Sequence, residues 1–187
     1  MVKSTIFIVA FLTAGRLRGQ DACEAKLPPS LRAEFKQAFP GHRQIVTSDY
    51  EPSELAAESK YHRGSRCIAV EPGDFNGDRR RDFVFLALSS TKSVVALVAL
   101  RLKAGWQIRE LLDLGFDQPG CCYANVLAPG TYKNFYGTAP DPQSLPAPDE
   151  RLTFTSKTQA LVVGAIESTG VAFFFSEGRW LHVRVSD

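Results

Sequence analysis

Two long apolar segments, residues 82–88 and 94–102, constrain the fold of this chain most strongly. They read DFVFLAL and VVALVALRL, and the polar residues 89–92 form a turn between them. Both are rich in β-branched and aromatic residues, which favour strands. Because they are apolar almost throughout, they are typical of strands buried on both faces. We therefore expect them to form the centre of a sheet.

The C-terminal third predicts an antiparallel meander. Residues 161–166, 171–175 and 180–185 are candidate strands, with turns at 167–170 and 176–179. In the last strand Trp180, His182 and Arg184 alternate with Leu181, Val183 and Val185, as in a half-buried edge strand. Weaker strand patterns cover residues 44–47, 67–71 and 106–112, and the proline-rich segment 132–150 is expected to be a long surface loop.

A helix is expected near the start of the globular region. Pro28 and Pro29 give a stiff entry, Ser30 is the expected cap, and Leu31 and Phe35 share one face with Ala38 or Phe39. Residues 54–61 fit a shorter helix. The predicted class is α+β, a largely antiparallel sheet with an N-terminal helix packed on it in a single domain.

Residues 1–22 resemble a secretory signal peptide. Lys3 precedes the apolar run 6–14, which is too short to span a bilayer. Cleavage is expected after Gly15 or Ala22. Residues 23–187 are then expected to form one globular domain. The mature protein is expected to be secreted or periplasmic and to have no transmembrane segment. A buried first strand or helix is the alternative reading. A lipoprotein acylated at Cys23 is a further alternative, although residues 20–22 lack the residues of a lipobox.

The chain has four cysteines, Cys23, Cys67, Cys121 and Cys122. An even number in an exported chain indicates disulfides, and four cysteines allow three connectivities. A bond between the adjacent Cys121 and Cys122 would close a strained ring. We therefore predict that Cys23 and Cys67 each pair with one of those two. Zinc is disfavoured because the sequence has no C-x-x-C pair.

The segment GDFNGDRRRDFVFLAL, residues 73–88, carries the one motif with metal-binding chemistry. Asp74, Asn76, Asp78 and Asp82 stand at positions 1, 3, 5 and 9 of a short loop, and Arg80 at position 7 offers its backbone carbonyl. Calcium takes six to eight oxygen ligands, and alternate residues of a tight turn point inward. The spacing therefore predicts a calcium site, with water completing the shell.

This loop and the strand after it resemble the calcium loop of FG-GAP and VCBS-type repeats. The resemblance covers residues 73–88, occurs once, and implies calcium ligation by Asp74, Asn76, Asp78 and Asp82 with a structural rather than catalytic role. Arg79 stands where the family has glycine, and three consecutive arginines (79–81) oppose a cation. The alternative is a turn in which the carboxylates bind backbone amides.

Catalytic signatures are absent from the sequence. It has no G-x-S-x-G elbow and no phosphate-binding loop, and His42, His62 and His182 are far apart. A net charge of +2 does not indicate a nucleic-acid partner.

We therefore expect an exported, non-enzymatic envelope or extracellular domain with a protein or glycan partner. The alternatives are a secreted hydrolase with scattered catalytic residues, or a binding or inhibitor module that uses residues 132–150. Arginines 79–81 fit contact with a phosphate or an acidic polymer, or a solvated turn.

Overall fold

The two apolar segments form the adjacent strands β3 (Asp82–Leu88) and β4 (Val94–Arg101) of a computed structural model that describes residues 20–134, 149–168 and 170–185. They pair antiparallel from Phe83 opposite Ala99 to Leu88 opposite Val94. Every residue of both strands is buried except the last of each. The expectation of central strands buried on both faces is confirmed.

Three further strands complete the first sheet. The short β1 (Arg43–Gln44) and β2 (Val70–Gly73) pair with opposite ends of β3, and β5 (Trp106–Asp113) pairs with the other side of β4. The register between β4 and β5 shifts at Ala96 and Leu97, which marks a β-bulge. The outer strand β5 alternates between exposed and half-buried residues, as an edge strand does.

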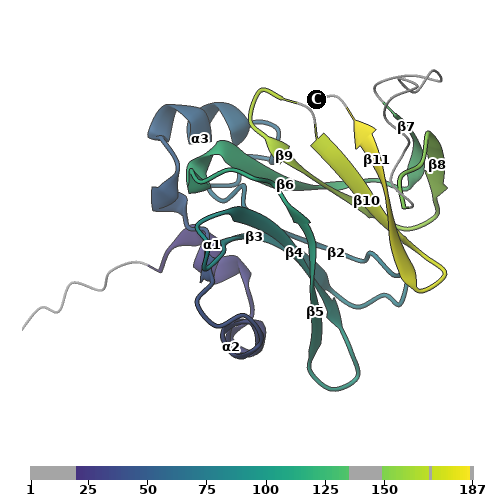
Figure 1. Ribbon diagram of the computed structural model, residues 1–187, viewed down its shortest axis with the longest axis horizontal. Coiled ribbons are helices and arrows are strands. Elements are labelled where there is room, and N and C mark those ends of the chain that lie inside the picture. The colour runs from purple at the N-terminus through teal and green to yellow at the C-terminus, as the bar shows by residue number, and fades with distance from the viewer. Residues whose placement is uncertain (1–19, 135–148, 169, 186–187) are drawn as a thin grey trace, which may run out of the picture.

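The second sheet contains β6 (Cys122–Leu127), β9 (Ala160–Ala165), β10 (Gly170–Ser176) and β11 (Arg179–Val185). All pairings are antiparallel, in the order β11-β10-β9-β6 (Figure 1). Glu177 and Gly178 connect β10 to β11 with φ of 51° and 80°, the backbone of a two-residue type I′ hairpin. The predicted C-terminal meander is confirmed.

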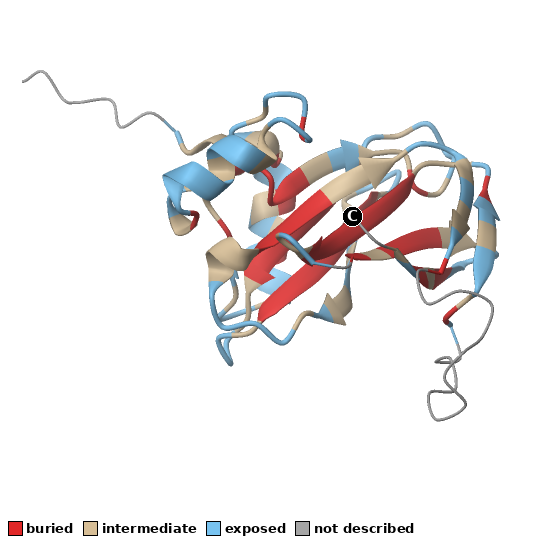
Figure 2. Ribbon diagram, turned by 90° about the horizontal axis from the view of Figure 1, so that it is seen from above, coloured by how far each residue is buried: buried red, intermediate tan, exposed pale blue. Residues whose placement is uncertain are grey.

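The two sheets share one apolar core. Buried residues concentrate on the strands of both sheets (Figure 2). The ring of Phe75, next to the first sheet, meets Trp180 of β11 edge-on at 6.3 Å. The amide of Ala124 in β6 donates to the carbonyl of Ile68 at 2.8 Å. The described residues therefore form a single small domain of mostly antiparallel sheet, as the coarse fold class predicted.

Helices are few and lie near the N-terminal end. They are α1 (Ala22–Lys26), α2 (Pro29–Ala38) and α3 (Pro52–Glu58), with 3₁₀ turns at Thr47–Asp49 and Pro119–Cys121. Phe35 of α2 is buried, and its ring contacts Phe85 of β3 edge-on at 5.3 Å. The expected cap is wrong: Pro28 occupies the N-cap, and the Ser30 hydroxyl instead accepts the indole N–H of Trp106 at 3.2 Å.

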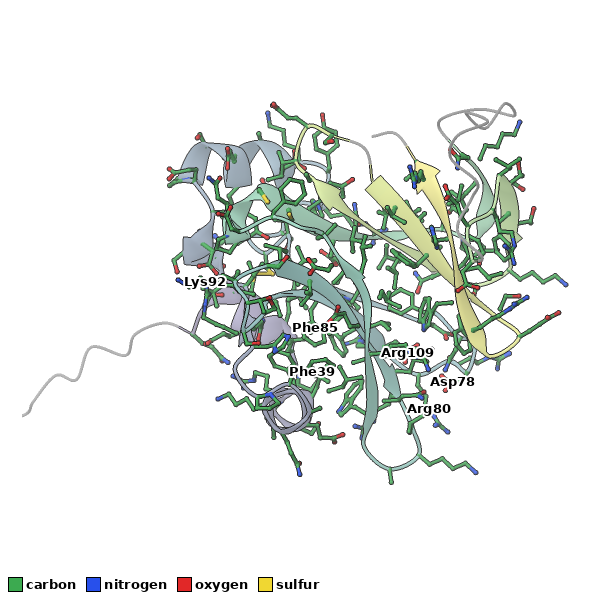
Figure 3. The ribbon with its side chains drawn as sticks, viewed as in Figure 1. Phe39, Asp78, Arg80, Phe85, Lys92 and Arg109 are labelled. Atoms are coloured by element: carbon green, nitrogen blue, oxygen red, sulfur yellow. A yellow bond between two sulfur atoms is a disulfide. The ribbon has the colours of Figure 1, made fainter. Side chains whose placement is uncertain are left out.

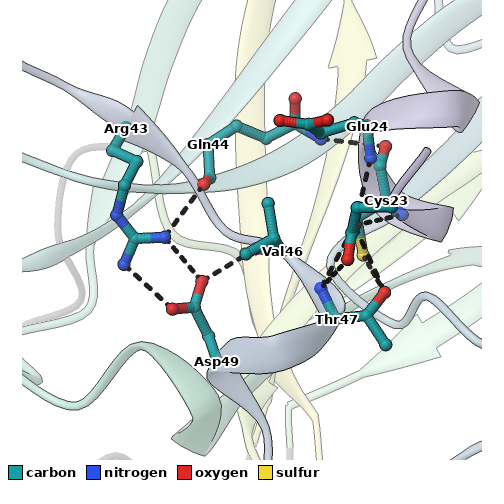
Figure 4. Close-up of polar contacts among 8 residues, drawn as sticks. Cys23, Glu24, Arg43, Gln44, Val46, Thr47 and Asp49 are labelled. Carbon is teal, nitrogen blue, oxygen red and sulfur yellow. Dashed lines mark hydrogen bonds and ion pairs between the residues drawn. The ribbon is translucent and has the colours of Figure 1, made fainter. Parts of the chain in front are cut away.

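A cluster of polar contacts fastens α1 to the segment after β1 (Figure 4). The Gln44 side chain donates to the carbonyl of Cys23 at 2.9 Å. Asp21 caps α1 by accepting the amides of Cys23 and Glu24, and it also accepts the amide of Thr47 at 3.0 Å. The start of the described chain is therefore tied to the body of the domain.

Several predicted boundaries are wrong. The expected strand at 44–47 ends at Gln44, and the strand expected at 67–71 begins only at Val70. The sequence analysis did not find β6 or the separate ribbon of β7 (Gly130–Lys133) and β8 (Thr153–Ser156). Residues 135–148 of the proline-rich segment, and residues 1–19 of the proposed leader, lie outside the described residues. Among the described helices, none has the length and apolarity to cross a bilayer.

Candidate functional site

The predicted calcium loop connects β2 to β3 and begins at a close backbone approach. The ring of Phe75 folds over Gly73, and a Cβ atom at Gly73 would lie 2.5 Å from its Cε1. Phe75 is fully buried, so this ring anchors the start of the loop in the core. A side chain at Gly73 would displace the Phe75 ring, which explains why this position holds glycine.

Side chains in the first part of the loop bind the loop's own backbone. The two carboxylate oxygens of Asp74 accept the amides of Gly77 at 2.8 Å and Arg79 at 3.0 Å. Asn76 accepts the amide of Asp78, and Asp78 in turn accepts the amide of Arg80 at 2.8 Å. These are successive Asx turns, in which short polar side chains take the place of backbone acceptors.

Asp82 closes the loop from inside the protein. It is fully buried, and its two oxygens accept the amides of Phe75 at 3.1 Å and Arg101 at 2.7 Å. Burial raises the pKa of Asp82 to about 6, the two backbone amides oppose that rise, and the carboxylates of Asp78 and Asp74 add to it. The carboxylate therefore fixes the loop to the end of β4.

The loop in this conformation does not fit a calcium ion. Every side-chain oxygen of Asp74, Asn76, Asp78 and Asp82 already accepts an N–H donor. No group of three or more acidic, histidine or cysteine side chains within the described ranges is arranged to hold a metal. Calcium binding, including a contribution from the Arg80 carbonyl, stays a prediction that requires the loop to rearrange. Arg79 does occupy the left-handed region, with φ of 64°, where the related repeats have glycine.

A basic groove lies beside this loop. It is an open depression of about 570 Å³. Its walls are the end of the loop, the start of β3 and the turn between β4 and β5. Its lining residues are Pro28, Arg80, Arg81, Phe83, Arg101, Leu102, Lys103 and Trp106. The sequence analysis singled out the arginines of the loop but not the other residues, which are separated from them by the length of two strands.

A second cavity, of about 600 Å³, lies between the end of α3 and the second sheet. His62 lines it and is 5% exposed, with Nδ1 3.6 Å from Oε1 of Glu71. Burial opposes ionisation of Glu71, but the nearby His62 and Lys26, which donates to Oε1 at 2.8 Å, outweigh it, and the pKa of Glu71 lies below its usual value. At 3.6 Å, His62 Nδ1 is beyond hydrogen-bond distance and has no hydrogen-bond partner among the described residues. Tyr123 contributes an aromatic wall, with its ring 6.0 Å from that of His62.

The cysteine pairing differs from the prediction. Cys23 is bonded to Cys67, and Cys121 and Cys122 are thiols with sulfur atoms 2.8 Å apart. The predicted connectivity is wrong because α1 places Cys23 beside the segment before β2, with Cα atoms 5.0 Å apart. Burial raises the pKa of both thiols, which disfavours the nucleophilic thiolate.

Comparisons with known proteins found no relatives: no family model, curated protein or solved structure gave a significant match to the chain. The resemblance of residues 73–88 to FG-GAP and VCBS-type loops therefore rests on those residues alone.

Proposed function

We propose that this chain is an exported, non-enzymatic domain of the cell envelope or extracellular space that acts by binding. The observation that carries the exported location in this proposal is the disulfide between Cys23 and Cys67. Both cysteines are fully buried, and the bond links α1 to the strand region across 44 residues. Disulfides of this kind persist in oxidising compartments, outside the cytosol.

A binding role agrees with how the loop carboxylates are used. Asp74 and Asp82 hold backbone amides in place and thereby shape the surface around the basic groove. Such a role also agrees with the structural part that FG-GAP-type loops play in the proteins that the motif resembles. In this proposal the loop rearranges to bind calcium weakly in the extracellular space, where the ion is abundant.

Export is tested by expressing the full chain with its leader and measuring the intact mass of the protein outside the cytoplasm. We expect a protein cleaved after Gly15, because Asp21 caps α1 and binds Thr47, and a cut after Ala22 would remove those contacts. An exported form that retains Met1, or a protein that stays in the cytoplasm with Cys23 and Cys67 reduced, would contradict the proposal.

A second candidate function, a secreted hydrolase, is favoured by the cavity that contains His62. A buried histidine beside a carboxylate is a typical general base once the two groups are hydrogen-bonded, and Glu71 lies 3.6 Å from Nδ1 of His62, close to that position. The described lining residues include no serine, threonine or cysteine, so the base would have to activate water.

The test of this candidate is an activity screen with ester, amide and glycoside substrates on wild type and His62→Gln. Tyr61→Phe, which keeps the aromatic ring at the cavity mouth, is the control variant. A hydrolytic rate that disappears in His62→Gln and persists in Tyr61→Phe would establish the enzyme. Equal rates in all three proteins would remove the candidate.

A further inference from the structure

We propose that the basic groove binds an acidic saccharide, with its carboxylate or sulfate groups on the arginines and lysine and a sugar ring on the aromatic floor. This inference deepens the proposed function by naming a ligand class for the domain. Its test uses purified, folded protein, so a failure to bind leaves the outcome of the export experiment unaffected.

The groove is lined by positive charge. Arg80, Arg81, Arg101 and Lys103 all line the groove. Arg80 lies 3.9 Å from Asp78, whereas no ion pair joins the other three to a carboxylate in the part of the chain that the structure describes. Four cations around one depression create a positive potential, and open walls leave their donors accessible to anionic groups.

Besides Asp78, two acidic residues beside the groove, Glu34 and Asp82, bind its backbone amides. Glu34 accepts the backbone amide of Trp106 at 2.9 Å, and Asp82 accepts that of Arg101 at 2.7 Å. Asp82 is fully buried, so it presents no oxygen to a ligand. These two carboxylates bind the backbone of the groove and form no ion pair with its cationic side chains among the described residues.

The groove also has an aromatic floor. Trp106 is half-buried, and its ring meets that of the buried Phe83 at 5.7 Å. The guanidinium of Arg101 stacks 4.7 Å from the centre of the Trp106 ring. Arg101 covers part of one face of the indole, so a sugar ring would pack on the part of the half-buried Trp106 that stays open and place its acidic substituents against the surrounding cations.

The groove is also held in a fixed shape. Ser30 accepts the indole N–H of Trp106 at 3.2 Å, and Glu34 accepts its backbone amide. Asp82 fixes Arg101 from the opposite side. Strand pairing and these bonds therefore set the backbone and the tryptophan before a ligand arrives, and the ordering cost on binding falls on the exposed side chains of Arg81 and Lys103.

The observations favour a saccharide over the other polyanions. A net charge of +2 and a single tryptophan in the groove give little to track a nucleic-acid backbone or stack successive bases. An anionic lipid surface would need apolar side chains to insert, and the one exposed large apolar residue of the groove is Leu102, at 43%. A sugar ring with acidic groups matches the chemistry of the depression, which combines four cations with one tryptophan.

The experiment is calorimetric titration of the disulfide-bonded protein with oligogalacturonate and with a sulfated heparin oligosaccharide. Methyl-esterified oligogalacturonate is the uncharged control ligand, and a single-stranded DNA oligonucleotide tests the other polyanion class.

The variants are Arg81→Glu and Lys103→Glu, which change two exposed residues of the groove. Lys92→Glu, at the opposite end of the sheet from Arg80 (Figure 3), makes the same charge change away from the groove. Melting curves establish that each variant is folded.

We expect at least one acidic oligosaccharide to bind, the esterified ligand not to bind, and each groove variant to weaken binding at least tenfold, or about 1.4 kcal/mol, because it loses a charge-assisted hydrogen bond. Lys92→Glu should leave the affinity unchanged. Three results would each overturn the proposal: no binding of either acidic ligand, an equal loss in Lys92→Glu, or tighter binding of the DNA than of both saccharides.

Discussion

The buried carboxylate of Asp82 accepts the backbone amide of Arg101 at 2.7 Å, which joins the beginning of β3 to the end of β4 across the sheet. The same carboxylate accepts the amide of Phe75, so one side chain holds the loop, its aromatic anchor and one wall of the basic groove. The protonation state of Asp82 therefore bears on all three.

We predict that Asp82 titrates near pH 6 in the folded protein. Its pKa is raised from 3.8 to about 6 by burial and by the carboxylates of Asp78 and Asp74. Between about pH 4 and pH 6 the folded state holds a proton that the unfolded state has released, so this residue's contribution to stability falls as the pH rises through that window.

Site-resolved carboxyl NMR should measure this titration directly, with a midpoint near 6 in wild type and a lower one in Asp78→Asn. A bulk stability curve is less specific, because the pKa of His182 is lowered by burial and its contribution changes in the opposite direction below pH 6.5. A midpoint for Asp82 near 4 would contradict the prediction.

We predict that Arg79→Gly stabilises the protein by about 1 kcal/mol. Arg79 has φ of 64°, a conformation that glycine adopts without the steric cost of a Cβ atom. Arg80→Gly is the matched control: the neighbouring residue has no positive φ, so the same change should destabilise by increasing the freedom of the unfolded chain. Thermal melting of both variants in EDTA decides the comparison.

Calcium binding is tested by thermal melting of wild type, Arg79→Gly and Asp78→Ala, in EDTA and in millimolar calcium. If the loop rearranges to bind the ion, the melting temperature of Arg79→Gly should rise in millimolar calcium, more than that of wild type, and Asp78→Ala should show no rise. Unchanged melting temperatures for wild type and Arg79→Gly would mean that the loop is only a turn, and that its resemblance to FG-GAP loops carries no function.

Removal of the Cys23–Cys67 disulfide should lower the free energy of unfolding by about 3–4 kcal/mol. The bond closes a loop of 44 residues, and its main effect is to restrict the unfolded chain. The measurement is chemical denaturation of wild type against Cys23→Ser/Cys67→Ser. Non-reducing peptide mapping should recover a 23–67 linked peptide and label Cys121 and Cys122 as thiols; a link from Cys23 to either of these would contradict the structure.

Gly120→Ala should destabilise the protein by about 2–3 kcal/mol through overpacking. A Cβ atom at Gly120 would lie 2.3 Å from the carbonyl oxygen of Asp49, a backbone atom that cannot rotate away. Gly130→Ala is the control, because the nearest atom to its added Cβ is 3.7 Å away. Similar denaturation midpoints for the two variants would show that the contact between the 3₁₀ turns is looser than described.

The sequence predicted the strands best where neighbouring residues alone determine the structure. Residues 82–88 and the segments after 160 carry strand propensity and clear turns, and the structure forms them with small shifts in boundaries. The missed strands β6 and β8 read CYANVL and TFTS, which are short and mixed in polarity. They become strands because partners in the sheets satisfy their backbones, and no local pattern reports such partners.

The candidate sites also differ in whether neighbouring or distant residues build them. The Asx turns follow from residues two to five positions apart, so the sequence anticipated them as one of two readings. The basic groove and the disulfide depend on long-range pairing: β3 pairs with β4, and thereby brings Arg81 near Lys103 and Trp106. One local pattern could have pointed to the groove: Trp106 follows the turn Lys103-Ala104-Gly105 directly after an apolar strand, so a cation and an aromatic ring lie at the same end of the sheet.

The bulge between β4 and β5 has a consequence for self-association. Leu112 and Glu110 face successive residues of β4, which leaves Leu111 as the extra residue and twists the outer strand. Arg109 and Glu110 on that strand are exposed and charged. A twisted, charged border is a poor template for a strand from another molecule, so at high concentration this side of the protein resists the edge-to-edge stacking that leads to aggregation.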